Sequence, residues 1–205
     1  QALSAEEAAE YYTDDWSETT VKTNVAQNKA AGGTSYKSGD AVDNAERRIN
    51  VAFKAFDGDA FTEKEDTTAK PDTSTSEMNS FWKGYHADSS LCVDLGETRT
   101  VSEVEIQWRY SGKGKDFNIL VSDDGENWTT AKEVRGNGDF FNTVSLDEPT
   151  EARYVKMQGI ASNASAGIYM IQEFKVYETV DKTQLNTLLK QAEELIKKDG
   201  LNFES

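Results

Sequence analysis

Hydrophobic and polar residues alternate with a period of two through most of the chain between residues 24 and 178. In the clearest example, Val104, Ile106 and Trp108 alternate with charged or polar neighbours. Because successive side chains of a β-strand point to opposite faces, this pattern predicts strands with one buried face. Similar runs cover residues 117–121, 128–134, 140–146, 153–157 and 169–177. Short strands at this spacing predict an antiparallel β-sandwich or barrel.

Turn-forming residues separate these runs. Asp124-Gly125, Gly136-Asn137-Gly138 and Glu148-Pro149 each predict a turn. Residues 62–80 are rich in Thr, Ser, Asp, Glu and Lys and too polar for a strand, so we expect a long surface insertion. Trp82 and Trp108 lie within apolar strand patterns and are expected in the core.

The two ends of the chain have different patterns. Residues 1–23 are acidic and alanine-rich, and we interpret them as a linker or the tail of a preceding domain. Residues 181–199 carry apolar side chains at helical spacing, which predicts an amphipathic helix. This helix must either pack on the main domain or begin a helical module, so residues 179–205 are assigned to a helical linker or truncated module. Because Gln1 is not a natural start, we expect an excised segment of a longer protein.

Charge narrows the classes of partner. The 205 residues include 37 acidic and 22 basic ones, for a net charge of −15. Such a field repels nucleic acid and anionic lipid headgroups but tolerates cations and neutral ligands. No apolar run approaches the ~20 residues of a membrane span. We therefore expect no nucleic acid partner and no membrane insertion. The single cysteine, Cys92, cannot form an internal disulfide, and its apolar surroundings predict a packed thiol.

Catalytic motifs are missing from the sequence. There is no nucleophile elbow, no His pair for zinc, no phosphate-binding loop and no Cys-x-x-Cys. Acidic residues are numerous enough to form pairs by chance, but nothing marks two of them for acid–base work. We expect a chain without catalytic activity of its own.

Five segments carry a family resemblance in the same order and spacing over about three quarters of the chain. They are Asn24–Ala31, Lys54–Thr62, Val93–Gly96, Ser122–Trp128 and Ile171–Tyr177. Together they resemble a discoidin, or coagulation factor 5/8 type C, domain, and within that superfamily carbohydrate-binding module family 32. The resemblance implies an all-β fold for residues 24–178, a jelly-roll-like antiparallel β-sandwich of the galactose-binding-like type, followed here by the C-terminal amphipathic helix. Residues 179–205 resemble the first helix of the FIVAR modules of surface-anchored glycosidases.

A loop with closely spaced carboxylates, Asp57-Gly58-Asp59, is the chemically richest stretch. Carboxylates, carbonyls and a hydroxyl on a Gly-bent loop suit a hard cation that takes oxygen ligands. The residues alone leave an ordinary Asp-Gly turn without metal as the alternative. The family resemblance implies a structural Ca²⁺, with ligands from the Lys54 carbonyl, Asp57, Asp59, Thr62, the Gln172 carbonyl and the Glu173 carboxylate.

Candidate sugar contacts come from the resemblance, which places the site on loops at one end of the sandwich. A sugar is held by an aromatic face against its C–H groups and by side chains that pair its hydroxyls. Lys83 stands where galactose-binding members carry a His, and the only His is His86, so a plain galactose preference is in doubt. The candidates are His86, Arg109, Phe140, Asn137, Lys83, Tyr110 and Asn163. For Arg109 a solvated strand end is the alternative, and either Phe140 or Phe141 must face inward because neighbours alternate.

The resemblance therefore implies a non-catalytic carbohydrate-binding module of a secreted or cell-surface bacterial enzyme, a glycosidase or other glycan-modifying enzyme. We expect a monomer whose partners are a catalytic domain in the same polypeptide and glycans ending in galactose, GalNAc or N-acetyllactosamine (LacNAc). The alternatives are an adhesive discoidin domain that binds a protein or lipid surface and, least favoured, an enzyme in its own right.

Overall fold

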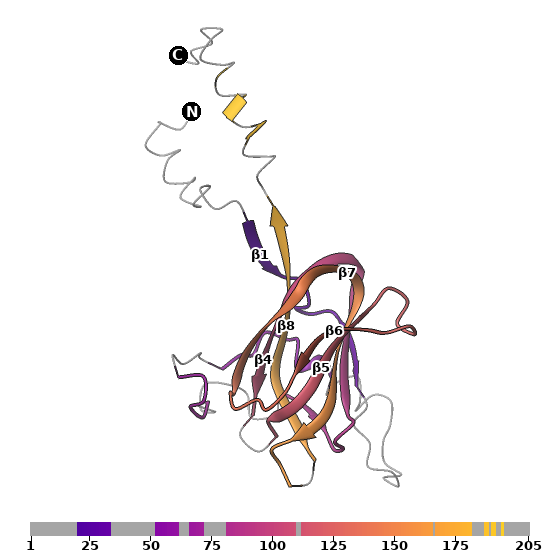
Figure 1. Ribbon diagram of the computed structural model, residues 1–205, viewed down its shortest axis with the longest axis vertical. Helices are drawn as coiled ribbons and strands as arrows, with labels where there is room; N and C mark the ends of the chain where they lie inside the picture. The colour runs from indigo at the N-terminus through magenta and orange to yellow at the C-terminus, as the bar shows by residue number, and fades with distance from the viewer. Residues whose placement is uncertain are drawn as a thin grey trace. The chain divides into compact units, whose positions relative to one another are not determined.

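The computed structural model describes residues 20–33, 52–61, 66–71, 81–109, 112–165 and 167–181, together with a few residues between 187 and 194. The described chain forms strands β1 (Thr20–Asn24), β2 (Ala30–Gly33), β3 (Trp82–Gly84), β4 (Ser90–Trp108), β5 (Gly114–Ser122), β6 (Thr129–Val134), β7 (Phe141–Ser162) and β8 (Tyr169–Asp181). Neighbouring strands pair in antiparallel fashion, which confirms the predicted all-β fold class (Figure 1).

The chain divides into two compact units, of which Thr23–Glu178 contains nearly all the described residues. The other unit comprises Gln1–Lys22 and Thr179–Ser205. Within its predicted C-terminal helix, Thr187, Leu188, Lys190, Gln191 and Glu194 are helical, and Leu188 is exposed. Asp181, the first residue of the predicted helix, belongs instead to β8. The remaining residues of that helix, and the predicted N-terminal segment up to residue 19, lie outside the described residues.

Two long strands connect the layers of the sandwich. The strand order is β1-β8-β4-β7-β5-β6, with β2 added to β4 and β3 added to β8. The first part of β4 pairs with β2, and its last part, from Val101 to Trp108, pairs with β8. β7 likewise pairs with β5 only through its second half, from Tyr154 onward. β4 and β7 therefore bend together from one layer into the other, as Figure 1 shows.

The predicted turn at Glu148-Pro149 is wrong, because β7 runs through it. The β4–β7 register instead shifts there: Glu103 faces Ser145, whereas Val101 faces Thr150. Extra residues on one strand make a bulge, which bends the strand and strengthens its twist. Proline has no N–H to give to the ladder, and a bulge is one of the places where a strand accepts it. By contrast, the predicted Asp124-Gly125 turn does connect β5 to β6.

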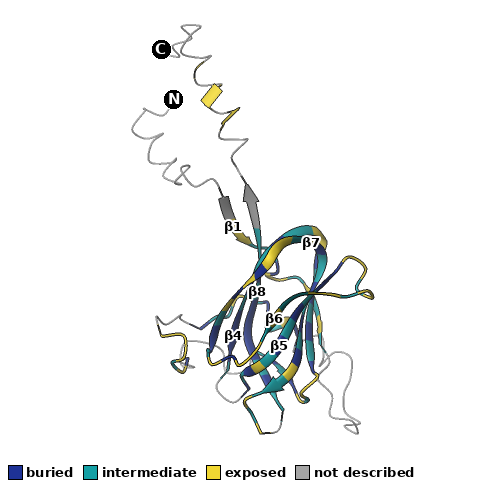
Figure 2. Ribbon diagram, viewed as in Figure 1, coloured by how far each residue is buried: buried dark blue, intermediate teal, exposed yellow. Residues whose placement is uncertain are grey.

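Aromatic side chains fill the space between the layers. Trp82 and Trp108 are both buried, as predicted. The ring of Trp108 lies 5.4 Å from that of Phe117 in an edge-to-face arrangement, which is favourable for aromatic pairs. Figure 2 shows the buried residues gathered along the strands. Cys92 is half-buried beside Lys156 rather than packed in the core, and partial burial raises the pKa of its thiol to about 11.

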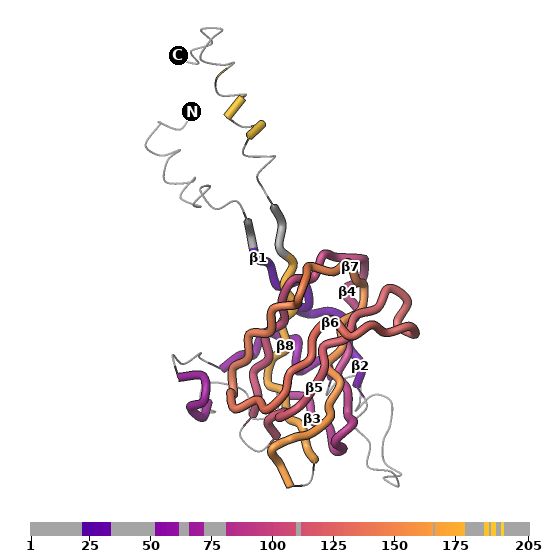
Figure 3. The backbone as a smooth tube through the Cα atoms, viewed as in Figure 1, coloured from indigo at the N-terminus to yellow at the C-terminus, as the bar shows by residue number. Residues whose placement is uncertain are grey.

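The two ends of the sandwich carry different segments of the chain. Asn24 ends β1 and Glu178 lies near the end of β8, so the main chain enters and leaves this unit at one end. Figure 3 shows the opposite end, where β3 and the turn between β7 and β8 lie. We call this opposite end the rim, formed by Arg109 and residues 84–89, 112–114, 136–140, 162–165 and 167–169. Among the described residues, no helix is long and apolar enough to cross a membrane.

Candidate functional site

Backbone hydrogen bonds hold the rim loops together around residues 112–115. The Met170 amide donates to the Gly112 carbonyl at 2.7 Å, and the Asn163 amide donates to the Lys113 carbonyl at 2.9 Å. On the other side, the Asn137 amide donates to the Lys115 carbonyl at 2.8 Å. The predicted site loops therefore meet at one end of the fold.

A tight turn fixes the loop that follows β3. The His86 amide donates to the Ser89 hydroxyl at 3.0 Å, and the Ser89 amide donates back to the His86 carbonyl at 3.0 Å. The hydroxyl of Tyr169 on β8 donates to the Ala87 carbonyl at 2.8 Å. The backbone around His86 is thus anchored to the β7–β8 end of the rim.

Tyr85 is the accessible aromatic residue on this loop, with 42 % of its surface exposed. The Lys83 ammonium lies 4.7 Å from the centre of its ring. His86 is half-buried beside it, and Asn163 on the neighbouring loop is exposed. An exposed ring with nearby donors is the combination that a neutral polyol requires. Tyr85 is not among the candidates predicted from the sequence, although an aromatic residue directly after a short strand at Gly84 was an available signal.

Asn137 is buried, and its side-chain amide is used inside the protein. Its Nδ2 donates to the Gly114 carbonyl at 2.8 Å and to the Asp139 carbonyl at 3.2 Å. Its Oδ1 accepts from the Asp139 amide at 2.9 Å and from Asn142 Nδ2 at 2.8 Å. These bonds shape the loop, so the structure assigns Asn137 a supporting role; its predicted contact with a sugar stays a prediction.

Phe140 is also largely covered, with 8 % of its surface exposed, and Phe141 is similarly buried. The Lys113 ammonium lies 4.2 Å from the Phe140 ring centre and donates a hydrogen bond to the Gly138 carbonyl. We expected one of the two phenylalanines to face inward, but both are buried. The segment around Thr67 lies against Phe140, since the Phe140 amide donates to the Thr67 carbonyl at 2.7 Å. The predicted stacking role of Phe140 is untested, and Tyr85 offers the more accessible ring.

Arg109 lies where the rim meets the loop Asp57-Gly58-Asp59, which we call the acidic loop. Its guanidinium carbon is 4.4 Å from the Phe81 ring centre and 5.7 Å from that of Phe61. Its Nη1 donates to Gln172 Oε1 at 2.7 Å. Burial lowers the pKa of Arg109, which the charge of Asp59 partly offsets. Arg109 is therefore half-buried and held by neighbouring side chains, and its predicted contact with a sugar stays a prediction. Tyr110, predicted beside it, lies outside the described residues.

The acidic loop has the tight geometry that its sequence implied. The Asp59 amide donates to Asp57 Oδ1 at 2.9 Å across Gly58. Gly58 has a φ of 86°, a left-handed conformation that favours glycine because other side chains are strained there. The loop is attached to β8, since the Gly58 amide donates to Glu173 Oε2 at 3.3 Å.

Glu173 places a buried carboxylate against this loop. Only 1 % of its surface is exposed, and burial, followed by the charge of Asp57, raises its pKa to about 8. A buried carboxylate near two more carboxylates is an oxygen-rich donor set that a hard cation would compensate. The described residues include no group of three His, Cys, Asp or Glu side chains gathered closely enough to hold a metal alone. An ion would therefore need backbone carbonyls as well, as the prediction for Lys54 and Gln172 requires; Thr62 lies outside the described residues.

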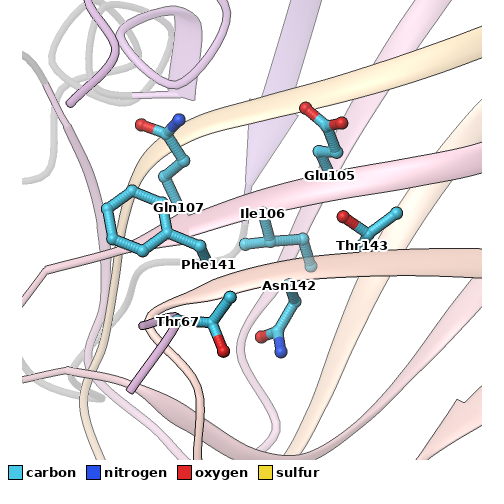
Figure 4. Close-up of a pocket in the computed structure, with 7 residues that line it drawn as sticks. All are labelled: Thr67, Glu105, Ile106, Gln107, Phe141, Asn142 and Thr143. Atoms are coloured by element: carbon cyan, nitrogen blue, oxygen red, sulfur yellow. The ribbon is translucent and has the colours of Figure 1, made fainter. Parts of the chain in front are cut away.

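A hollow along β4 and β7 adjoins this region (Figure 4). It is lined by Thr67, Glu105, Ile106, Gln107, Phe141, Asn142 and Thr143. Two of its polar side chains are bonded to neighbours: Gln107 Oε1 accepts from the Phe61 amide at 2.8 Å, and Glu105 Oε2 accepts from Lys175 Nζ at 3.1 Å. The hollow thus lies beside the contacts that fasten residues 52–61 to the sheet.

Comparisons with known proteins concern the family and the fold of the chain. The family model described as F5/8 type C domain matches residues 34–174. The chain is similar to a mutant of chitosan-binding module 1 from the chitosanase/glucanase of Paenibacillus sp. IK-5, with 25 % identity and a TM-score of 0.56, covering 77 % of this chain and 99 % of that one. It is also similar to the family 32 carbohydrate-binding module of C. perfringens NanJ, solved with galactose, with 24 % identity and a TM-score of 0.53, covering 77 % and 100 %.

A fucose-binding module from Streptococcus pneumoniae shares the fold at 19 % identity, with a TM-score of 0.53, covering 77 % of this chain and 96 % of that one. At this level of identity the likeness concerns the fold alone. No curated protein sequence matches the chain.

Proposed function

The chain belongs to the F5/8 type C domain family, and from this premise we propose that it is a carbohydrate-binding module that holds a neutral glycan at its rim. The observation that carries the proposal is the exposed ring of Tyr85, flanked by Lys83 and His86 on a loop whose backbone is fixed. A rigid site loses little conformational entropy on binding, which helps a weak ligand.

The proposed binding mode follows from the chemistry of these groups. The Tyr85 ring stacks on the C–H face of a terminal sugar, and the polar ends of Lys83, His86 and Asn163 pair with its hydroxyls. Arg109 contributes from the inner side of the rim, where its position is set by Phe81 and Gln172. We propose a terminal galactose, GalNAc or LacNAc group as the ligand, on the likeness to a family 32 module that was solved with galactose. A neutral ligand also suits a strongly acidic protein.

We also propose that the acidic loop holds a structural Ca²⁺. The ligands would be the carbonyls of Lys54 and Gln172, the carboxylates of Asp57, Asp59 and Glu173, and Thr62. When bound, the ion supplies positive charge that compensates the buried Glu173 carboxylate. Through the ion, the segment of residues 54–62 would be attached to Gln172 and Glu173 on β8, the last strand.

The wider role is that of an accessory module in a secreted or cell-surface bacterial protein. Appended to a catalytic domain, a weak glycan-binding module raises the local concentration of that domain at its substrate. This role requires no catalytic group in the module, and it suits a monomer.

A glycan array tests the function directly. We expect binding to galactose-, GalNAc- or LacNAc-terminated glycans with Kd between ~10 μM and ~1 mM, about −7 to −4 kcal/mol. The array includes chitooligosaccharides and fucosylated glycans, so that other sugar classes are detected. Vesicles of anionic lipid and immobilised extracellular matrix proteins serve as comparison surfaces. No signal on the array combined with binding to one of those surfaces would overturn the proposal in favour of an adhesive domain.

A further inference from the structure

The side chain of Gln172 is fully buried and is bonded at both ends of its amide. Its Oε1 accepts from Arg109 Nη1 at 2.7 Å. Its Nε2 donates to the Asp59 carbonyl at 2.6 Å and lies 3.3 Å from Asp59 Oδ2. One side chain therefore connects a rim residue with the acidic loop, which lies far away in the sequence.

The chemistry of the partners allows only one orientation of this amide. A guanidinium is a donor without acceptor atoms, whereas a backbone carbonyl only accepts. Gln172 must therefore turn its oxygen to Arg109 and its nitrogen to Asp59. A carboxylate at this position could not donate to the Asp59 carbonyl, and an apolar side chain could make neither bond. The arrangement requires glutamine's particular pair of groups.

Both ends of this connection lead to rigid surroundings. On the rim side, the Arg109 amide donates to the Met170 carbonyl at 2.9 Å, and the Gly112 amide donates to the Arg109 carbonyl at 3.1 Å. On the loop side, Gly58 is bonded to Glu173, and the Phe174 amide donates to the Ala55 carbonyl at 2.7 Å. We therefore expect a displacement of Asp59 to move Arg109, because close packing on either side does not absorb it.

We propose that Gln172 is a positioning residue that couples the acidic loop to the rim, so that a cation at the loop and a glycan at the rim strengthen each other's binding. The proposal rests on the proposed function and assigns to the Gln172 side chain a role separate from that of its carbonyl. The coupling is reciprocal, since linkage requires each ligand to change the other's affinity by the same factor.

The first test measures N-acetyllactosamine binding to the full chain by calorimetry, with saturating Ca²⁺ and with a chelator. In the wild type we expect Ca²⁺ to lower the Kd by about fivefold or more, at the lower end of usual coupling. Gln172→Met keeps the length of the side chain but makes neither hydrogen bond. In this variant the Ca²⁺-induced rise in Tm persists, whereas the ratio of the two Kd values falls close to one. An equal ratio in the variant and the wild type would overturn the proposal.

A second measurement needs neither glycan binding nor the variant. The side-chain Nε–Hε signal of Arg109 is followed by NMR while Ca²⁺ is added to the wild-type chain. We expect the signal to shift in step with the Ca²⁺-dependent stabilisation. If Ca²⁺ does not bind, or binds without moving this signal, the coupling is refuted. If the signal moves but no glycan binds, the proposed function fails while the connection through Gln172 stands, so the two failures are distinguishable.

Discussion

Arg153 and Asp94 are joined by two parallel hydrogen bonds, from Nε to Oδ1 at 2.8 Å and from Nη2 to Oδ2 at 2.9 Å. The pair braces β7 against β4 where both strands bend, since the regular register of β4 is interrupted directly after Asp94. The Gly96 amide also donates to Asp94 Oδ1 at 2.8 Å, so one carboxylate holds both the partner strand and the start of the bend.

This pair predicts a pH dependence at the acid end. The hydrogen bonds from Arg153 lower the pKa of Asp94 below its ordinary value of 3.8. A lowered pKa stabilises the folded state above the unfolded pKa, and this stabilisation is lost as pH falls through the folded pKa. Asp94→Asn should therefore be less stable than the wild type at about pH 6, and the difference should shrink below about pH 4. Thermal unfolding of both proteins at a series of acidic pH values measures this difference in stability. A difference that stays constant with pH would refute the stabilising role of the Arg153–Asp94 pair.

Removing the charge of Glu173 should have opposite effects with and without Ca²⁺. Without the ion at about pH 7, Glu173→Gln should raise the free energy of unfolding by about 1 kcal/mol or more. The raised pKa means that the wild-type carboxyl must take up a proton when the chain folds, whereas the amide is neutral in both states. With the ion, the variant should lose most of the Ca²⁺-induced rise in Tm. Differential scanning calorimetry with Ca²⁺ and with a chelator measures both. Glu103→Gln, on β4 and away from the acidic loop, is the matched control and should keep the full response.

Tyr85→Ala should weaken glycan binding by about tenfold or more, which corresponds to a stacking contact of about 1.4 kcal/mol. Because Tyr85 is exposed, the melting temperature should change little. Phe53→Ala removes an aromatic ring of similar exposure from the segment before the acidic loop and is the control. Calorimetric titration measures the glycan affinity of both variants. Unchanged affinity in Tyr85→Ala would show that the Tyr85 ring does not contact the sugar.

Asn137→Ala should mainly lower the stability of the fold. The hydrogen bonds of its amide include one to the Gly114 carbonyl, which the alanine variant leaves buried without that partner. We expect a loss of about 1–3 kcal/mol in the free energy of unfolding, measured by urea denaturation. Asn163→Ala, at an exposed rim position, should stay within about 0.5 kcal/mol. Full stability in Asn137→Ala would refute the supporting role that these hydrogen bonds assign to Asn137.

Much of the architecture could be predicted from local pattern. The alternation around Val104, Ile106 and Trp108 indicated a strand, and the structure places that strand as the last part of β4. The turn predicted at Glu148-Pro149 is wrong because a turn dipeptide indicates only a local conformational preference. Pairing with β4 on both sides of the bulge overrides that preference.

The sequence by itself determined the strand pattern, the buried tryptophans and, through the spacing of its motifs, the family. Those features depend on properties that each short segment carries with it, such as periodicity, polarity and turn chemistry. Only the tertiary structure decided that Asn137 and Phe140 are covered, that Tyr85 is exposed and that Gln172 connects Arg109 with Asp59. Exposure and hydrogen bonding depend on which distant segments of the chain fold over a residue. The sequence next to a residue does not specify those long-range contacts.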